Sequence, residues 1–186
     1  MRTYRYIGSL LAILLLGATH AAAQDKDKVG VVMGYPASVG VIFPVTGKIA
    51  VRPELSLSGA SSSATGSAFV FDVDGWTVGA GVSALFYLRT YDHLRTYFTP
   101  RVVYSHSSNT SSTSSLISSS STTTANGITV TGSVGAQYGL GDRFGVFGEV
   151  GFGGGHSTTK GAILTTTRST SNSWGLRSGV GVILYF

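Results

Sequence analysis

Apolar and polar positions alternate along most of the chain. At the carboxyl end, large or apolar side chains stand at every second position from Trp174 to Phe186, except at Ser178. Successive side chains of a β-strand point to opposite faces, so a period of two predicts a strand that is apolar on one face. This segment therefore predicts a strand with one lipid-compatible face and a terminal aromatic residue.

The same alternation recurs in five earlier segments and predicts a β-strand in each. The regular strands are expected at residues 49–59, 76–90, 95–106, 127–140, 144–156 and 173–186. Two less regular segments, 29–35 and 38–44, supply two more strands, with Pro36 in a tight loop between them. Pro44 and Pro53 interrupt ladder hydrogen bonding, so prolines here mark a strand start, a bulge or an unpaired position. The total is eight, because no remaining segment is apolar enough for another hairpin.

The connections between these strands alternate between short and long. The short links are rich in Gly, Asp and polar residues and lie at 45–48, 91–94 and 141–143. The long links are rich in small and hydroxylated residues and lie at about 59–75, 107–126 and 157–172. Short periplasmic turns with longer outer loops are typical of bacterial outer-membrane barrels. The Ser/Thr run within 107–126 either forms a mobile loop or extends its hairpin as polar strands beyond the membrane.

The amino-terminal residues 1–23 are expected to be a cleaved signal peptide. Arg2 and Arg5 precede an apolar stretch from Ile7 to Ala18, and Ala21 to Ala23 provide a small-residue cleavage site. The alternative, a transmembrane helix, needs roughly 20 apolar residues, and this stretch is much shorter. The mature chain then has a short segment at 24–28, followed by a barrel domain at 29–186.

The composition favours membrane-spanning strands over a water-soluble domain. Only 11% of the residues are charged, against about 25% in ordinary globular chains. Mean hydropathy is +0.26, although no long apolar helix is present. The formal net charge is +5, but the basic residues are scattered, so nucleic-acid binding is not expected. The chain contains no Cys, which excludes disulfides, thiolate metal sites and lipid anchoring through an amino-terminal Cys.

Eight strands enclose an interior that is just wide enough for side chains to fill. On the polar faces of the predicted strands, five charged residues point inward: Arg52, Glu54, Arg101, Glu149 and Arg177. Lone charges in a narrow lumen are costly, so we expect each Glu to pair with one or more Arg. The resulting network would plug the barrel, and the alternative is an ion or solute pathway through it.

Together, the signal peptide, strand periodicity, loop asymmetry and terminal Phe186 resemble those of small outer-membrane β-barrel proteins of the OmpA and OmpX type, a porin-family group. The resemblance covers residues 27–186 and implies an all-β fold, an eight-stranded antiparallel transmembrane β-barrel. It also implies that Val182, Leu184 and Phe186 form the signal that the barrel-assembly machinery reads. The chain ends at the barrel, so we expect no periplasmic peptidoglycan-binding domain.

His106 is a candidate for a catalytic role, because an outer-membrane lipid A deacylase of eight strands uses a similar His, Ser and Asn pattern. Ser108 and Asn109 complete that pattern here. A catalytic His must be oriented by a third group, however, and no Asp or Glu occurs between His106 and Asn126. The spacing of the other His, Asp and Glu residues supports no metal site. We therefore expect no enzyme activity, catalytic residue, metal or cofactor.

The sequence favours a structural or surface-interaction role in the bacterial outer membrane. The expected contacts are outer-membrane lipid and lipopolysaccharide, with the barrel-assembly machinery engaged during biogenesis. We expect a monomer that binds no nucleic acid. A small-solute or ion-conducting channel is the first alternative, and a deacylase-like enzyme is the second.

The predicted faces are tested by two arginine substitutions on one strand. Val134→Arg places a charge on the proposed lipid face and should cost about 2–4 kcal/mol near the bilayer midplane. Thr131→Arg points inward, so it should be limited by space and charge pairing instead. Folding in lipid or detergent reports both effects, and equally intact folding of the two variants would show that the faces are misassigned.

Overall fold

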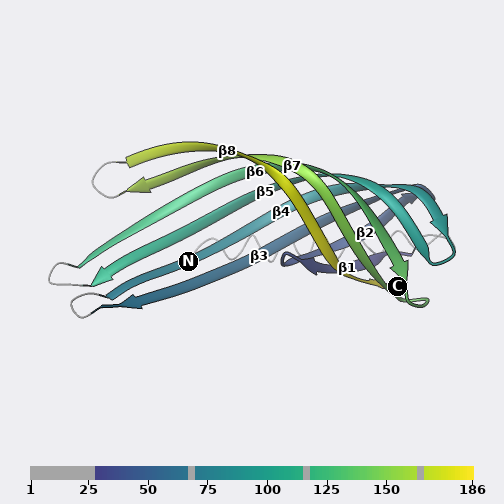
Figure 1. Cartoon of the computed structure of the whole chain (residues 1–186), viewed down its shortest axis with the longest axis horizontal. Helices are drawn as coiled ribbons and strands as arrows, with labels where there is room; N and C mark the ends of the chain where they lie inside the picture. Colours follow the sequence, from purple (N-terminus) through teal and green to yellow (C-terminus); the bar gives the residue numbers. More distant parts are fainter. Residues whose placement is uncertain (1–27, 67–69, 115–117, 163–165) are drawn as a thin grey trace.

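The computed structural model describes residues 28–66, 70–114, 118–162 and 166–186. The expected signal peptide, 1–23, and nearly all of segment 24–28 lie outside the described residues. The described chain forms eight β-strands (Figure 1). They are β1 (Gly30–Tyr35), β2 (Ser38–Thr46), β3 (Ile49–Thr65), β4 (Val70–Tyr91), β5 (Leu94–Ser114), β6 (Ser119–Gly139), β7 (Phe144–Ala162) and β8 (Thr166–Tyr185).

Each strand pairs antiparallel with the next, and the last pairs with the first. Gly30 of β1 lies opposite Tyr185 of β8, and Tyr35 lies opposite Val180, so the sheet closes into a barrel. The predicted eight-stranded antiparallel fold is thus confirmed. None of the described residues belongs to a helix long and apolar enough to cross a membrane.

Short turns join the strands at the end of the barrel where the carboxyl terminus lies (Figure 1). Gly47 and Lys48 link β2 to β3, whereas Asp92 and His93 link β4 to β5. Asp92 has a φ of 40°, in the left-handed region that Asp tolerates better than most residues. The register between β2 and β3 shifts at Pro44, as expected where a proline interrupts a ladder.

The strands extend much further than the apolar alternation indicates. The segments expected as long loops, 59–75, 107–126 and 157–172, are mostly strand, so the polar-strand alternative for the Ser/Thr run is the one observed. Backbone pairing needs no apolar side chain, and hydroxyl groups face one another across the ladder. For example, Thr110 Oγ1 lies 3.2 Å from Thr122 Oγ1. Three long hairpins therefore project beyond the short β1–β2 hairpin (Figure 1).

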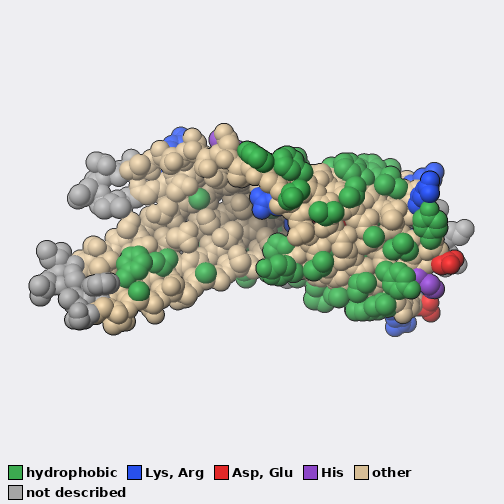
Figure 2. Space-filling model, in the orientation of Figure 1, with side chains coloured by type: hydrophobic (Ala, Val, Ile, Leu, Met, Phe, Trp, Pro, Cys, Tyr) green, Lys and Arg blue, Asp and Glu red, His purple; other side chains and the backbone are tan. Residues whose placement is uncertain are grey.

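The two faces of the barrel wall differ as predicted. Leu85, Tyr97 and Ile183 point inward and are fully buried, whereas Val134 points outward and is 54% exposed. The outward apolar side chains form a band that covers about eleven residues of a strand, for example Trp174 to Leu184. Exposed apolar side chains of this band occur on all eight strands. In Figure 2 they gather on one half of the visible face, whereas the other half is mostly neither apolar nor charged.

Small residues inside the barrel leave room for large ones on neighbouring strands. Tyr97 of β5 lies opposite Gly135 of β6, and a Cβ at Gly135 would lie 2.6 Å from Cζ of the Tyr97 ring. Phe147 of β7 similarly lies over Gly181 of β8. Gly135 and Gly181 are therefore required by the aromatic side chains that fill the lumen.

Gly135→Ala should destabilise the barrel by about 1–3 kcal/mol, because the new methyl group overlaps a fully buried ring. Urea unfolding in lipid vesicles, followed by tryptophan fluorescence, measures the change. Gly148→Ala on β7 is the matched control, since its Cβ meets no atom within 4 Å, and it should change stability by less than about 0.5 kcal/mol. Similar losses in both variants would contradict the packing described above.

Candidate functional site: the charged lumen

Four of the five charged residues expected in the lumen lie together inside the barrel. Arg52 and Glu54 come from β3, Arg101 from β5 and Glu149 from β7. The strand period places all four on the inward face, because each is an even number of residues from a buried neighbour on its own strand. Arg52 is 3% exposed and Glu54 is 8% exposed, so these charges are almost completely removed from water.

Arg52 is the centre of the network. Its guanidinium donates from Nη1 to Glu149 Oε1 at 2.7 Å and from Nη2 to Glu149 Oε2 at 3.3 Å. The Nε of Arg52 donates to Ser83 Oγ at 3.0 Å and lies 3.9 Å from Glu54 Oε2. Two parallel bonds to one carboxylate are the strongest form of this ion pair and fix its orientation.

The second ion pair joins Arg101 to Glu54, with Arg101 Nε donating to Glu54 Oε1. Glu149 accepts one further hydrogen bond from the hydroxyl of Tyr97, at 2.8 Å. The network contains two cations and two anions, so it has no net charge. Pairing and hydrogen bonding together offset the cost of desolvating these groups.

Aromatic side chains complete the filling of the lumen. The Arg52 guanidinium lies 5.6 Å from the centroid of the Phe147 ring, and Tyr97 meets Tyr87 edge to face at 6.0 Å. A cavity of about 30 Å³ lies beside the network, between Arg52, Glu149 and Phe147. This volume is enough for about two water molecules. The barrel is therefore plugged at this level.

Arg177 is not part of this network. It lies on β8 opposite Gly151, at an inward position, but its side chain is exposed and makes no ion pair within the described residues. The reason is its position along β8. Only the segment from Val180 to Tyr185 pairs with β1, and Arg177 lies outside it. Beyond Val180 no strand of the described residues lies beside β8 on that side, so solvent reaches Arg177.

Tyr97, Ser83 and Phe147 are members of the lumen site that charge patterning alone does not identify. All three occupy inward positions of predicted strands, which is the signal that could have found them. The partner of each group depends on strand register and on contacts across the barrel. Neither can be read from a single segment.

The carboxyl-terminal residues Val182, Leu184 and Phe186 lie on the outward face of the barrel. Leu184 is 39% exposed and Phe186 is 72% exposed. The backbone N–H of Phe186 donates to the carbonyl oxygen of Val29 at 3.0 Å, which ties the end of the chain to the first strand. These side chains are therefore accessible to a protein that contacts the outside of the barrel.

His106 and Ser108, the candidate catalytic pair, both point outward on β5. His106 Nδ1 lies 2.7 Å from Asn126 Oδ1, and no hydrogen bond joins His106 to Ser108 among the described residues. A similar pair occurs on β7 and β8, where His156 Nδ1 lies 2.8 Å from Asn172 Oδ1. Because the arrangement is repeated, a cross-strand structural contact explains it without catalysis. The described residues contain no cluster of three or more metal-ligating side chains.

Comparisons with known proteins connect the chain to others by fold alone. No protein-family model matches the sequence, and a search of the curated proteins found no significant match. The crystal structure of a major outer membrane protein from Thermus thermophilus is similar, with a TM-score of 0.58 and 14% identity over 86% of this chain and 98% of that chain. The crystal structure of Acinetobacter baumannii CarO2 matches with a TM-score of 0.47 and 14% identity, covering 86% of this chain and 97% of that chain. The chain thus shares the fold of a solved outer-membrane protein.

Arg52→Met should lower the free energy of unfolding by about 3–5 kcal/mol, because Glu149 is left buried without its main partner. The double variant Arg52→Met with Glu149→Gln should recover much of that loss. Urea unfolding in lipid vesicles gives the coupling free energy. Arg177→Met is the matched control and should change stability by less than about 0.5 kcal/mol, since Arg177 is exposed and forms no ion pair with any described residue. A loss at Arg52 no larger than the loss at Arg177 would contradict the network.

Proposed function

We propose that the protein is a non-enzymatic β-barrel of the bacterial outer membrane, with a plugged lumen and a structural or surface-interaction role. The observation that carries the proposal is the lumen itself. Ion pairs and aromatic rings occupy it and leave a cavity of about 30 Å³ beside the network. A barrel filled in this way presents its outer surface and its hairpins to partners, rather than a pore.

The apolar band supports the placement in a membrane. Its length of about eleven residues on a strand such as β6, from Ile128 to Tyr138, suits the span of a tilted membrane strand. Aromatic residues stand at both margins of the band, with Trp76 and Trp174 at one and Tyr138 and Phe144 at the other. Such girdles are typical of outer-membrane barrels. In water, an apolar surface of this extent would cause association.

The orientation in the membrane follows from the hairpins. The three long hairpins are rich in Ser and Thr, so they suit the aqueous medium outside the cell, and the short turns then face the periplasm. Residues 1–23 serve as the cleaved export signal, and Val182, Leu184 and Phe186 serve as the signal read by the barrel-assembly machinery. The outward face contacts membrane lipid and lipopolysaccharide, and the barrel works as a monomer.

Two measurements test this proposal. Cell fractionation, with heat-modifiable migration on a gel, should place the folded protein in the outer membrane, and its recovery as an ordered water-soluble protein would overturn the placement. In planar bilayers the purified protein should show no steady open level, because the lumen is filled. The double variant Arg52→Ala with Tyr97→Ala removes two side chains that fill the lumen. Variant protein that shows heat-modifiable migration, and is therefore folded, should conduct ions. A steady open level of the unaltered protein would favour the alternative, a channel for ions or small solutes.

A further inference from the structure

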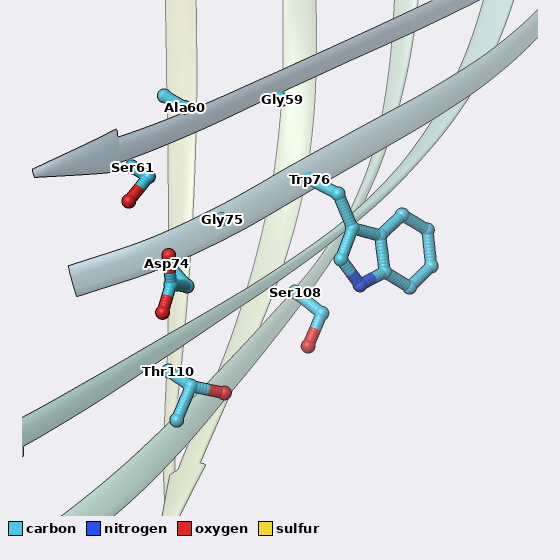
Figure 3. A pocket seen from close by; sticks show the side chains of 8 residues that line it. All are labelled: Gly59, Ala60, Ser61, Asp74, Gly75, Trp76, Ser108 and Thr110. Carbon is cyan, nitrogen blue, oxygen red and sulfur yellow. The ribbon is translucent and has the colours of Figure 1, made fainter.

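A cleft of about 470 Å³ opens on the outward side of β3, β4 and β5, away from the charged lumen (Figure 3). Asp74 and Trp76 of β4 form one part of its lining, and Ser108 and Thr110 of β5 form another. Gly59 of β3 lies directly opposite Trp76 and carries no side chain. The protein surface is therefore recessed beside the indole ring, which forms the cleft. Its volume is within the range of small-molecule sites.

The lining combines one flat aromatic face with a carboxylate and several hydroxyl groups. Trp76 is 47% exposed, so its ring is accessible from the cleft. In Figure 3 the Trp76 ring stands on one side of the cleft, with the carboxylate of Asp74 and the hydroxyls of Ser108 and Thr110 around the remaining space. The carboxylate only accepts hydrogen bonds, whereas each hydroxyl both donates and accepts.

This set of groups fits a sugar ring better than a cation. The C–H groups of a pyranose can pack on the negative face of an indole, while its hydroxyls donate to a carboxylate and exchange hydrogen bonds with Ser and Thr. An ammonium group would satisfy Trp76 and Asp74, but it has no acceptor for the hydroxyl protons of Ser108 and Thr110. A polyhydroxylated ligand satisfies the whole lining.

The indole ring is held in place before any ligand arrives. The imidazole of His106 packs against it, with ring centroids 5.4 Å apart. Asn126 Oδ1 anchors that imidazole at 2.7 Å and also accepts a hydrogen bond from the Tyr104 hydroxyl at 2.9 Å. An amide oxygen is an acceptor only, so His106 Nδ1 carries the proton in this pair. A side chain fixed in this way loses little entropy on binding.

The second tryptophan provides an internal comparison. Trp174 of β8 is also outward-facing at the margin of the apolar band, and it is 80% exposed. It packs on Phe152, with ring centroids 6.0 Å apart, and it does not border the cleft. A lipid-interface role alone would apply to both tryptophans, but the carboxylate and hydroxyl lining is found beside Trp76.

The position of the cleft relative to the apolar band indicates which kind of molecule carries the saccharide. Trp76 ends the apolar band on β4, and the next two outward positions toward the hairpin tip are Asp74 and Asp72, so the cleft lies where hydrocarbon would give way to headgroups. We propose that this outward cleft binds one saccharide ring of a glycolipid in the outer leaflet of the membrane. The inference rests on the proposed outer-membrane placement and adds a defined lipid-headgroup site to it.

The test uses the full mature chain, folded in detergent micelles, with Trp174→Phe as the background. The protein has two Trp residues, so Trp76 is then the only indole reporter. Titration with the lipid-free core oligosaccharide of a lipopolysaccharide should change the Trp76 emission in a saturable way. Intact lipopolysaccharide in mixed micelles should compete for the same site. A saturable response to free glucose polymers but to neither lipopolysaccharide form would overturn the glycolipid source.

Three variants make the result specific. Asp74→Asn should weaken binding about tenfold, because a charge-assisted hydrogen bond is lost. Gly59→Val should abolish binding by filling the cleft, and it should still fold, since a Cβ at Gly59 meets its nearest atom only at 3.6 Å. Trp76→Phe should weaken binding of the oligosaccharide about tenfold, measured by titration calorimetry because Trp174 does not border the cleft and cannot report on it.

The remaining outcomes separate this inference from the proposed function. Saturable binding of tetramethylammonium in place of the oligosaccharide would show a cation site and overturn the assignment. Absence of any saturable response, in protein that shows heat-modifiable migration and fractionates with the outer membrane, would overturn the saccharide site alone. Absence of the protein from the outer membrane would overturn the proposed function, whatever the titration shows.

Discussion

Closure of the sheet between β1 and β8 is the constraint on which the rest of the structure depends. A chain that spans a bilayer must pair every backbone N–H and C=O internally, because hydrocarbon offers no partner. The six residues of β1 achieve this by joining β8 on one side and β2 on the other. Eight strands closed in this way leave a narrow interior. The barrel must therefore be filled by its own side chains, and small inward residues such as Gly135 must alternate with large ones such as Tyr97.

The paired charges in the lumen are a consequence of the narrow interior of the barrel. Arg52, Glu54, Arg101 and Glu149 stand on three different strands, so the Arg52–Glu149 and Arg101–Glu54 ion pairs also connect separate strands. The Arg52–Glu149 pair bridges β3 to β7 on opposite sides of the barrel, and the Arg101–Glu54 pair bridges β5 to β3 past β4, which holds these parts of the wall at a defined distance. Because the four charges sum to zero, the network fills space without creating a strong field for one sign of ion. This arrangement suits a plug that also specifies register.

Much of the fold could be predicted from the sequence, because half-buried strands have a period of two that is readable in a single chain. The number of strands, their inward faces and the inward position of Arg52 all follow from it. The length of the hairpins does not, since a Ser/Thr segment such as 107–114 pairs through its backbone without any apolar alternation. The exposure of Arg177 could not be predicted from the sequence either. Its surroundings depend on how far β1 extends along β8, and only the register shows that.

The uneven heights of the hairpins limit how the barrel can sit in a bilayer. Above Val180 on β8 and above Ser56 on β3, the described strands have no neighbour on the side of the short β1–β2 hairpin. The backbone groups along these two edges need water or polar headgroups, so on this side hydrocarbon must end near the Pro36 turn, below the margin that Trp174 marks on β8. On the opposite side, β5 and β6 remain paired as far as Thr113, and only side-chain polarity sets the boundary. In the proposed membrane placement, the unpaired backbone thus limits how deeply one side of the barrel enters the bilayer, and the surrounding lipid must adjust its thickness to match it.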